Sequence, residues 1–219
     1  YWAFALLLPA VAIVTASAIH IVVFDGQFAP EPVSALVLYP ILFLYVFLVG
    51  GGNEELGWRG VALPRLQRSY PALRASLVLG VVWFAWHLPL FLNATTTHGG
   101  WPRSQQLLWM VSILAGSILW TWMYNSTGGS VLAVAVFHAG VNAMGIFHPA
   151  DREALIPNGV PDPWLNLLAE VTGAIPLVLV ALLLIVVYGV NRLSNREPPT
   201  PQDAGLPPDS DSAAAQCAR

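Results

Sequence analysis

The stretch Val33–Val49, VSALVLYPILFLYVFLV, contains no charged residue and runs directly into three consecutive glycines. A helix needs about 20 apolar residues to cross the hydrocarbon core of a bilayer, so this stretch is nearly long enough to span one. Its apolar residues are continuous and do not alternate with polar ones, which argues against the strand of a transmembrane barrel. Because backbone N–H and C=O groups must be paired inside hydrocarbon, we expect a spanning helix here.

Five further stretches share this character, and together they indicate the fold class. They run over about 2–24, 75–92, 107–124, 131–147 and 167–190. The composition agrees, with 56% hydrophobic and 10% charged residues, whereas a soluble domain usually carries about 25% charged residues. One such stretch could be the core helix of a large soluble protein, but six in succession argue against that. The sequence therefore predicts an all-α, polytopic transmembrane bundle of about six spanning helices.

The two ends of the chain differ from this pattern. Residues 195–219 are rich in Pro, Ser and Asp and cannot bury enough apolar surface to offset their chain entropy. We therefore expect a membrane domain over 1–194 and a disordered cytoplasmic tail over 195–219. The chain is apolar from Tyr1 onward, so we expect that it is truncated at its N-terminus. Cys217 is the single cysteine, which excludes an internal disulfide framework.

The distribution of arginine predicts the orientation. In a six-helix count, the loop after the second stretch and the tail after the sixth fall on one side of the membrane. That side carries Arg59, Arg65, Arg68, Arg74, Arg192 and Arg196, and the opposite loops carry only Arg103 and Arg152. Cytoplasmic loops have an excess of basic residues. We therefore expect a multi-pass protein of the cell membrane whose Arg-rich loop and C-terminus are cytoplasmic. The net charge of −3 gives no indication of a nucleic-acid partner.

The first polar cluster follows the second apolar stretch and reads GGGNEELGWRG over residues 50–60. The glycines should break the helix, and Asn53 is a good N-cap for a new one. Glu55 and Arg59 are four residues apart and can pair on a helix. Glu54 points about 100° away from Glu55 and has no partner at that spacing. We expect Glu55 to be structural and Glu54 to face a cavity as a general base. The alternative, two glutamates on a surface helix, leaves the three glycines unexplained.

Two further polar clusters lie inside apolar stretches. His87 is deep in the stretch over 75–92. His138 and Asn142 are four residues apart, so they share one helix face. Asn142 could orient the imidazole of His138, or both side chains could donate to a developing oxyanion. Each cluster alone could be a polar contact between helices. Together with Glu54, however, these costly residues on three separate helices are explained at once by an active site.

These clusters resemble the signature of the CPBP intramembrane protease family, also called the CAAX-protease and bacteriocin-processing or Abi family. It is related to the Rce1-type CAAX prenyl endopeptidases. The signature has two glutamates and an arginine, then a phenylalanine and a histidine, then a histidine with asparagine or aspartate. It is matched by Glu54, Glu55 and Arg59, by Trp83 and His87, and by His138 and Asn142. The resemblance covers about residues 50–142, and the one departure is Trp83 in place of phenylalanine.

The resemblance implies an intramembrane endopeptidase that hydrolyses a membrane-associated substrate of the prenylated CaaX or bacteriocin type. Glu54 would activate the water with help from His87, and His138 and Asn142 would stabilise the oxyanion. Three supporting residues would hold the site in shape: Glu55, Arg59 and Trp83. The expected partners are a peptide or lipidated peptide and membrane lipid, with the oligomeric state left open.

Three alternatives remain at this stage. Glu54, His87 and His138 could instead bind zinc, which commonly takes three protein ligands in catalytic sites. We expect no cofactor, because the chain lacks an HExxH pair and an oxyanion role needs His138 free of metal. A second alternative is a non-catalytic membrane partner or immunity-type protein of the same fold. A third is a secondary transporter, but its inverted repeat is not found.

Overall fold

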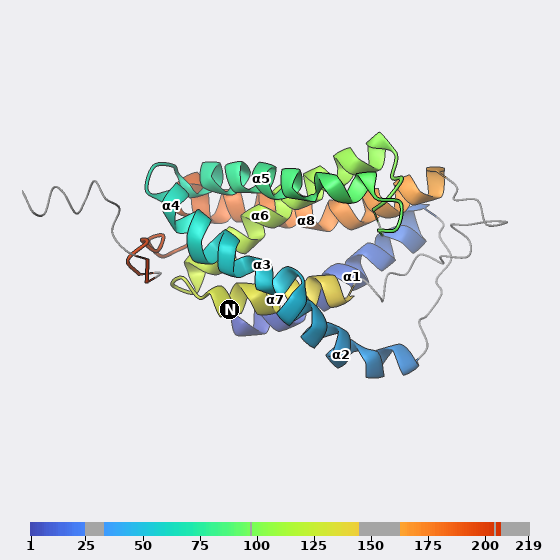
Figure 1. Ribbon diagram of the computed structural model, residues 1–219, viewed down its shortest axis with the longest axis horizontal. Coiled ribbons are helices and arrows are strands. Elements are labelled where there is room, and N and C mark those ends of the chain that lie inside the picture. The colour runs from blue at the N-terminus through green and yellow to red at the C-terminus, as the bar shows by residue number, and fades with distance from the viewer. Residues whose placement is uncertain (25–32, 97, 145–162, 204, 207–219) are drawn as a thin grey trace, which may run out of the picture.

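The structure is a computed structural model, and it describes residues 1–24, 33–96, 98–144, 163–203 and 205–206. Every regular element in these ranges is helical (Figure 1). The helices are α1 (Trp2–Phe24), α2 (Val33–Val49), α3 (Gly51–Gly57), α4 (Leu63–Gln67), α5 (Ala72–Leu92), α6 (Arg103–Ser126), α7 (Val131–Met144) and α8 (Pro163–Arg192), with a π-helical turn, η1 (Trp58–Ala62), between α3 and α4.

Four helical stretches are long and apolar enough to cross a membrane. They are Val37–Gln67, Ala72–Leu92, Arg103–Ser126 and Ala174–Arg192, and two shorter apolar helices cover Trp2–Val11 and Val131–Ala143. The expected all-helical fold is therefore confirmed for the described residues, with four candidate membrane-spanning helices. The number of six spanning helices remains a prediction.

Helix α6 forms the centre of the bundle. It packs against both α5 and α8, while α7 packs against α1, α2 and α3 (Figure 1). All residues from Ala115 to Ser126 are buried, including polar ones such as Thr121 and Asn125. By contrast, α2 and α8 expose many large aliphatic side chains. Such surfaces suit a bilayer, because apolar side chains need no shielding from lipid.

A sharp corner separates α2 from α3 at the glycines. Gly50 caps α3 with φ −112° and ψ −132°, and no side chain caps this helix. The predicted break is therefore confirmed, but the expectation that Asn53 would be the N-cap is wrong. Asn53 lies inside α3 and its backbone N–H donates to the carbonyl oxygen of Gly50 over 3.0 Å. The helix begins earlier than expected because glycine alone can make this corner: a Cβ at Gly52 would lie 2.6 Å from the carbonyl oxygen of Phe47.

A buried asparagine ties three helices together at the other end of α6. The side-chain amide of Asn125 donates to Gln67 Oε1 over 2.8 Å and to the backbone oxygen of Arg192 over 2.7 Å. Its own oxygen accepts from Gln67 Nε2 over 3.1 Å. Asn125 has no exposed surface, so both of its partners would lose a bond in a dry setting if it were removed.

The chain continues past α8 along this end of the bundle. Pro199 and Pro201 are buried, and the Pro199 ring lies against Gly129, which has φ +90°. These residues belong to the segment expected to be disordered. Residues 204 and 207–219, including Cys217, lie outside the described residues, so the domain boundary after 194 remains a prediction.

We expect Asn125→Ala to lower the thermal stability of the detergent-purified protein. The change leaves Gln67 and the Arg192 carbonyl unsatisfied in a buried position, which should cost about 3 kcal/mol. The matched control is Asn191→Ala, because Asn191 is exposed near the end of α8. The measurement is the temperature at which half of the protein has aggregated. Equal temperatures for the two variants would contradict the role given to Asn125.

Candidate active site

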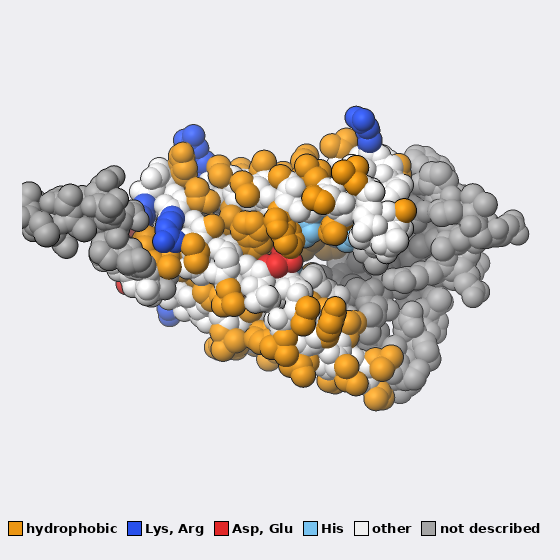
Figure 2. Space-filling model, viewed as in Figure 1, with side chains coloured by type: hydrophobic (Ala, Val, Ile, Leu, Met, Phe, Trp, Pro, Cys, Tyr) orange, Lys and Arg blue, Asp and Glu red, His pale blue; other side chains and the backbone are white. Residues whose placement is uncertain are grey.

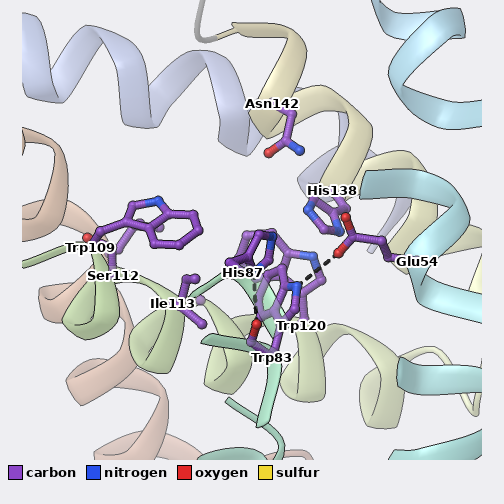
Figure 3. Close-up of a pocket in the computed structure, with 11 residues that line it drawn as sticks. Glu54, Trp83, His87, Trp109, Ser112, Ile113, Trp120, His138 and Asn142 are labelled. Carbon is purple, nitrogen blue, oxygen red and sulfur yellow. Dashed lines mark hydrogen bonds between the residues drawn. The ribbon is translucent and has the colours of Figure 1, made fainter. Parts of the chain in front are cut away.

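The main polar side chains predicted for the site line one cavity inside the bundle. The cavity has a volume of about 150 Å³ and is lined by Glu54, His87, His138 and Asn142 (Figure 3). Its other walls are largely aromatic or aliphatic: Trp83, Trp109, Trp120, Ile113 and Leu177. Figure 2 shows acidic and histidine side chains in a hollow midway along the molecule, between apolar surfaces. The sequence prediction that these residues meet in space is thus matched by their positions.

Glu54 reaches the cavity from α3 with only one of its oxygens engaged. Its Oε2 accepts hydrogen bonds from Trp83 Nε1 over 2.9 Å and from Trp58 Nε1 over 3.4 Å. Within the described ranges, its Oε1 has no hydrogen-bond partner. One oxygen therefore fixes the carboxylate, and the other is available to a water molecule or a substrate.

Glu55, the next residue along α3, points into the protein and is fully buried. Arg59 Nη1 donates to both of its carboxylate oxygens over 3.1 Å, and Arg59 is also fully buried. The expected pair at a spacing of four residues is therefore present. Because the two charges compensate each other, neither is left isolated in a medium where an unpaired ion is costly.

Two serines connect this ion pair to the neighbouring helices. Arg59 Nη2 donates to Ser117 Oγ over 3.3 Å, and Ser117 Oγ donates to the backbone oxygen of Ser76 over 2.8 Å. Arg59 lies in η1, and local π-helical turns often occur at functional sites. The guanidinium thus links the segment that carries both glutamates to α6 and α5.

His138 is positioned by Glu55. Its Nδ1 lies 2.7 Å from Glu55 Oε1, and the ring is only 3% exposed. A carboxylate oxygen accepts, so Nδ1 donates. The sequence left open whether Asn142 orients this ring; the structure gives that role to Glu55. Residues 55 and 138 are far apart in the chain, and no spacing rule within one helix could have related them.

His87 is fixed in a similar way by its own helix. Its Nδ1 lies 2.8 Å from the backbone oxygen of Trp83, one turn earlier in α5. A carbonyl oxygen can only accept, so Nδ1 carries the proton. In the neutral ring the other nitrogen, Nε2, is then left as an acceptor. The ring is 9% exposed and lies edge-to-face with Trp109, with their centroids 4.9 Å apart.

Trp83 contacts more of the site than its place in the sequence suggests. Besides donating to Glu54, its ring lies 5.3 Å from the Arg59 guanidinium carbon. It also meets the His138 ring edge-to-face, with their centroids 5.3 Å apart. Phenylalanine, the residue of the resembled motif, could keep the ring contacts but has no N–H group for Glu54. The departure from the motif therefore adds a hydrogen bond to the candidate base, which the sequence comparison did not reveal.

The zinc alternative can be compared with these positions. In the part of the chain that the structure describes, no three His, Cys, Asp or Glu side chains lie close enough together to hold a metal ion. Glu54, His87 and His138 share the cavity but, as they are placed, they do not form a three-ligand cluster.

Comparisons with known proteins agree with the resemblance seen in the motifs. Residues 36–144 match the family model for the type II CAAX prenyl endopeptidase Rce1-like proteins. CAAX prenyl protease 2 of Methanococcus maripaludis is 37% identical over 106 residues, which are 47% of this chain and 38% of that relative. The chain thus spans well under half the length of this curated relative.

The matched segment holds the complete signature on α3, η1, α5 and α7. It begins in α2 and ends in α7, so it also contains the corner at Gly50 and the buried part of α6. The chain belongs to the Rce1-like family of type II CAAX prenyl endopeptidases, a family of peptidases.

Proposed function

We propose that this chain is an intramembrane endopeptidase that uses Glu54 to activate water. The observation that carries this proposal is the convergence of Glu54, His87, His138 and Asn142 on one cavity between apolar helices. A carboxylate with a free oxygen and an imidazole acceptor can activate water, and two nitrogen-bearing side chains can stabilise an oxyanion, which are the two tasks of peptide hydrolysis by water.

The hydrolytic step follows from the hydrogen bonds at Glu54 and His87. Oε2 of Glu54 is fixed by Trp83, so Oε1 accepts a proton from the attacking water, which His87 Nε2 helps to orient. The water oxygen forms a bond to the carbonyl carbon of the scissile peptide. The same proton is then donated to the amide nitrogen as the C–N bond breaks, which leaves a carboxylic acid and an amine as products and Glu54 as it began.

His138 and Asn142 would stabilise the negative oxygen of the tetrahedral intermediate. Nδ1 of His138 donates to Glu55, so donation by Nε2 to the oxyanion requires a ring that carries both protons. Asn142 lies on the same face of α7 and has an exposed side chain at the cavity. Its amide can therefore reach a substrate without first breaking a buried contact.

The substrate that we propose is a membrane-associated peptide of the prenylated CaaX or bacteriocin-like type. The relative's name supports the CaaX type, and the apolar surface around the cavity supports a lipidated or membrane-embedded chain. We also propose six spanning helices, with the arginine-rich end at the cytoplasmic face. Figure 2 shows basic side chains gathered at the end of the molecule where α4 lies, with a further one at the opposite end.

A non-catalytic binding protein of the same fold is the second candidate. The arrangement around Glu54 favours the peptidase, because a binding surface would not need a carboxylate with one fixed and one free oxygen beside two histidines in one cavity. The experiments below separate the two candidates.

We expect Glu54→Gln to lower the cleavage rate of a fluorogenic, lipid-anchored peptide library by at least about 100-fold. The thermal stability of the protein should not change. Glu55→Gln should lower both, because breaking one partner of a buried ion pair costs about 3–5 kcal/mol. Glu197→Gln, at an exposed carboxylate, is the control and should change neither. Full cleavage by Glu54→Gln would exclude the proposed base. No cleavage by the folded unmodified protein, over a broad library, would favour the binding protein.

Trp83→Phe should reduce kcat by about tenfold, because the hydrogen bond that fixes Glu54 is lost while the ring contacts remain. A hydrogen bond to a charged group is worth about 1.5–3 kcal/mol. Only part of this should be lost, because Trp58 still donates to the same oxygen of Glu54. Trp58→Phe is the matched comparison and should have a smaller effect, since its bond is 3.4 Å long. Equal kcat values for Trp83→Phe and the unmodified protein would contradict this role.

We expect metal chelation to leave the cleavage rate unchanged. The measurement is the rate for the purified protein after dialysis against EDTA, compared with the rate after zinc is added back. A loss on chelation that zinc restores would contradict the metal-free mechanism and would make Glu54, His87 and His138 the ligands.

A further inference from the structure

Gly51, the first residue of α3, lies against the two proposed oxyanion donors. A Cβ built on Gly51 would lie 2.5 Å from His138 Nε2 and 2.6 Å from Asn142 Nδ2. The nearest ring carbon of His138, Cδ2, would be 2.6 Å away. The two nitrogens therefore converge on one point beside a backbone that has no side chain, and any residue other than glycine would occupy that point.

The imidazole cannot easily move away from such a side chain. Its other nitrogen is held by Glu55 over 2.7 Å, and Glu55 is held in turn by Arg59. The ring is also packed edge-to-face against Trp83 and Trp120, with centroids 5.3 and 5.4 Å away. Relief of the clash would thus require loss of the Glu55 bond or a shift of α3 away from α7. Asn142 is exposed and would be displaced first.

We infer that Gly51 is a positioning residue of the peptidase site: its missing side chain lets α3 approach α7 closely enough for the two oxyanion donors to converge. This inference rests on the proposed function for its effect on turnover, but the steric relation is independent of it. Gly51 itself takes no part in the chemistry and acts only through His138 and Asn142.

The other two glycines of α3, Gly52 and Gly57, provide comparisons on the same helix. At Gly57, a Cβ would meet nothing within 4 Å. At Gly52 it would meet the backbone of Phe47, with the nearest atom 2.6 Å away. Gly57→Ala therefore tests the effect of an added methyl group that clashes with nothing. Gly52→Ala tests damage to the corner between α2 and α3, without a direct contact to the donors.

The first measurement is kcat and KM for the three alanine variants in the full chain. Gly51→Ala should lower kcat by about 100-fold, as expected when an oxyanion donor is lost, with KM changed by less than about threefold. Gly57→Ala should match the unmodified protein. A kcat for Gly51→Ala equal to that of Gly57→Ala would overturn the inference.

A double-mutant comparison separates positioning from general damage. In an Asn142→Ala background, Gly51→Ala should cost less than it does alone, because the part of its effect that acts through Asn142 is already lost and only the part that acts through His138 remains. Gly52→Ala should cost the same factor in both backgrounds, since the corner does not act through Asn142. Equal factors for Gly51→Ala in both backgrounds would exclude any action through Asn142 and would overturn the inference that Gly51 positions both donors.

A spectroscopic measurement keeps the test independent of catalysis. In histidine-labelled ¹⁵N spectra, the signal of the Nδ1–H group that donates to Glu55 is assigned by its loss in His138→Gln. It should shift or disappear in Gly51→Ala and stay unchanged in Gly57→Ala. If the unmodified protein cleaves nothing but this signal responds, the proposed function fails and the positioning role stands. If cleavage occurs and the signal is unchanged in Gly51→Ala, the positioning role fails alone.

Discussion

The buried pair of Glu55 and Arg59 is the interaction on which the rest of the site depends. Both side chains are fully enclosed, and removal of either would leave an isolated charge in a medium that cannot solvate it. The pair also has partners on three other helices: the carboxylate accepts from His138, and the guanidinium reaches Ser117, whose hydroxyl donates to α5. A single ion pair therefore fixes how α3, α5, α6 and α7 stand relative to one another, and the cavity lies where they meet.

The pair also explains why two adjacent glutamates can have different tasks. Successive residues on a helix point about 100° apart, so a segment that buries Glu55 must direct Glu54 elsewhere. At Glu54 the hydrogen-bond donors are the indole N–H groups of Trp58 and Trp83, and the side chain lines the cavity. An indole donates a hydrogen bond but carries no charge that would compensate a carboxylate. Glu54 therefore keeps one oxygen without a hydrogen-bond partner in the described ranges, beside the cavity, whereas both oxygens of Glu55 accept from Arg59 and one of them also accepts from His138.

Much of this arrangement could be predicted from the sequence, because it depends on regular helix geometry. The apolar stretches predict the bundle, and the spacing of four residues predicts both the Glu55–Arg59 pair and the shared face of His138 and Asn142. What could not be predicted depends on contacts between helices. The bond from His138 to Glu55 joins α7 to α3, and the bond from Trp83 to Glu54 joins α5 to α3. The assignment of Asn53 as a cap failed for a local reason, since glycine can form the corner without any side-chain cap.

The three glycines before the glutamates show how the geometry of the site restricts which residues can occupy positions 50–52. Glycine in a helix is about 1 kcal/mol less favourable than alanine, so three in succession need a cause beyond flexibility. Each has a different one: Gly50 forms the corner, Gly52 leaves room for the Phe47 backbone, and Gly51 leaves room for the nitrogens of His138 and Asn142. Only the last concerns chemistry. If α3 stood further from α7, a side chain would fit at residue 51, but Glu55 could then no longer reach His138. The short hydrogen bond between Glu55 and His138 and the absence of a side chain at Gly51 therefore express one constraint, the close approach of α3 to α7. The glycine that allows this approach makes the helix less stable.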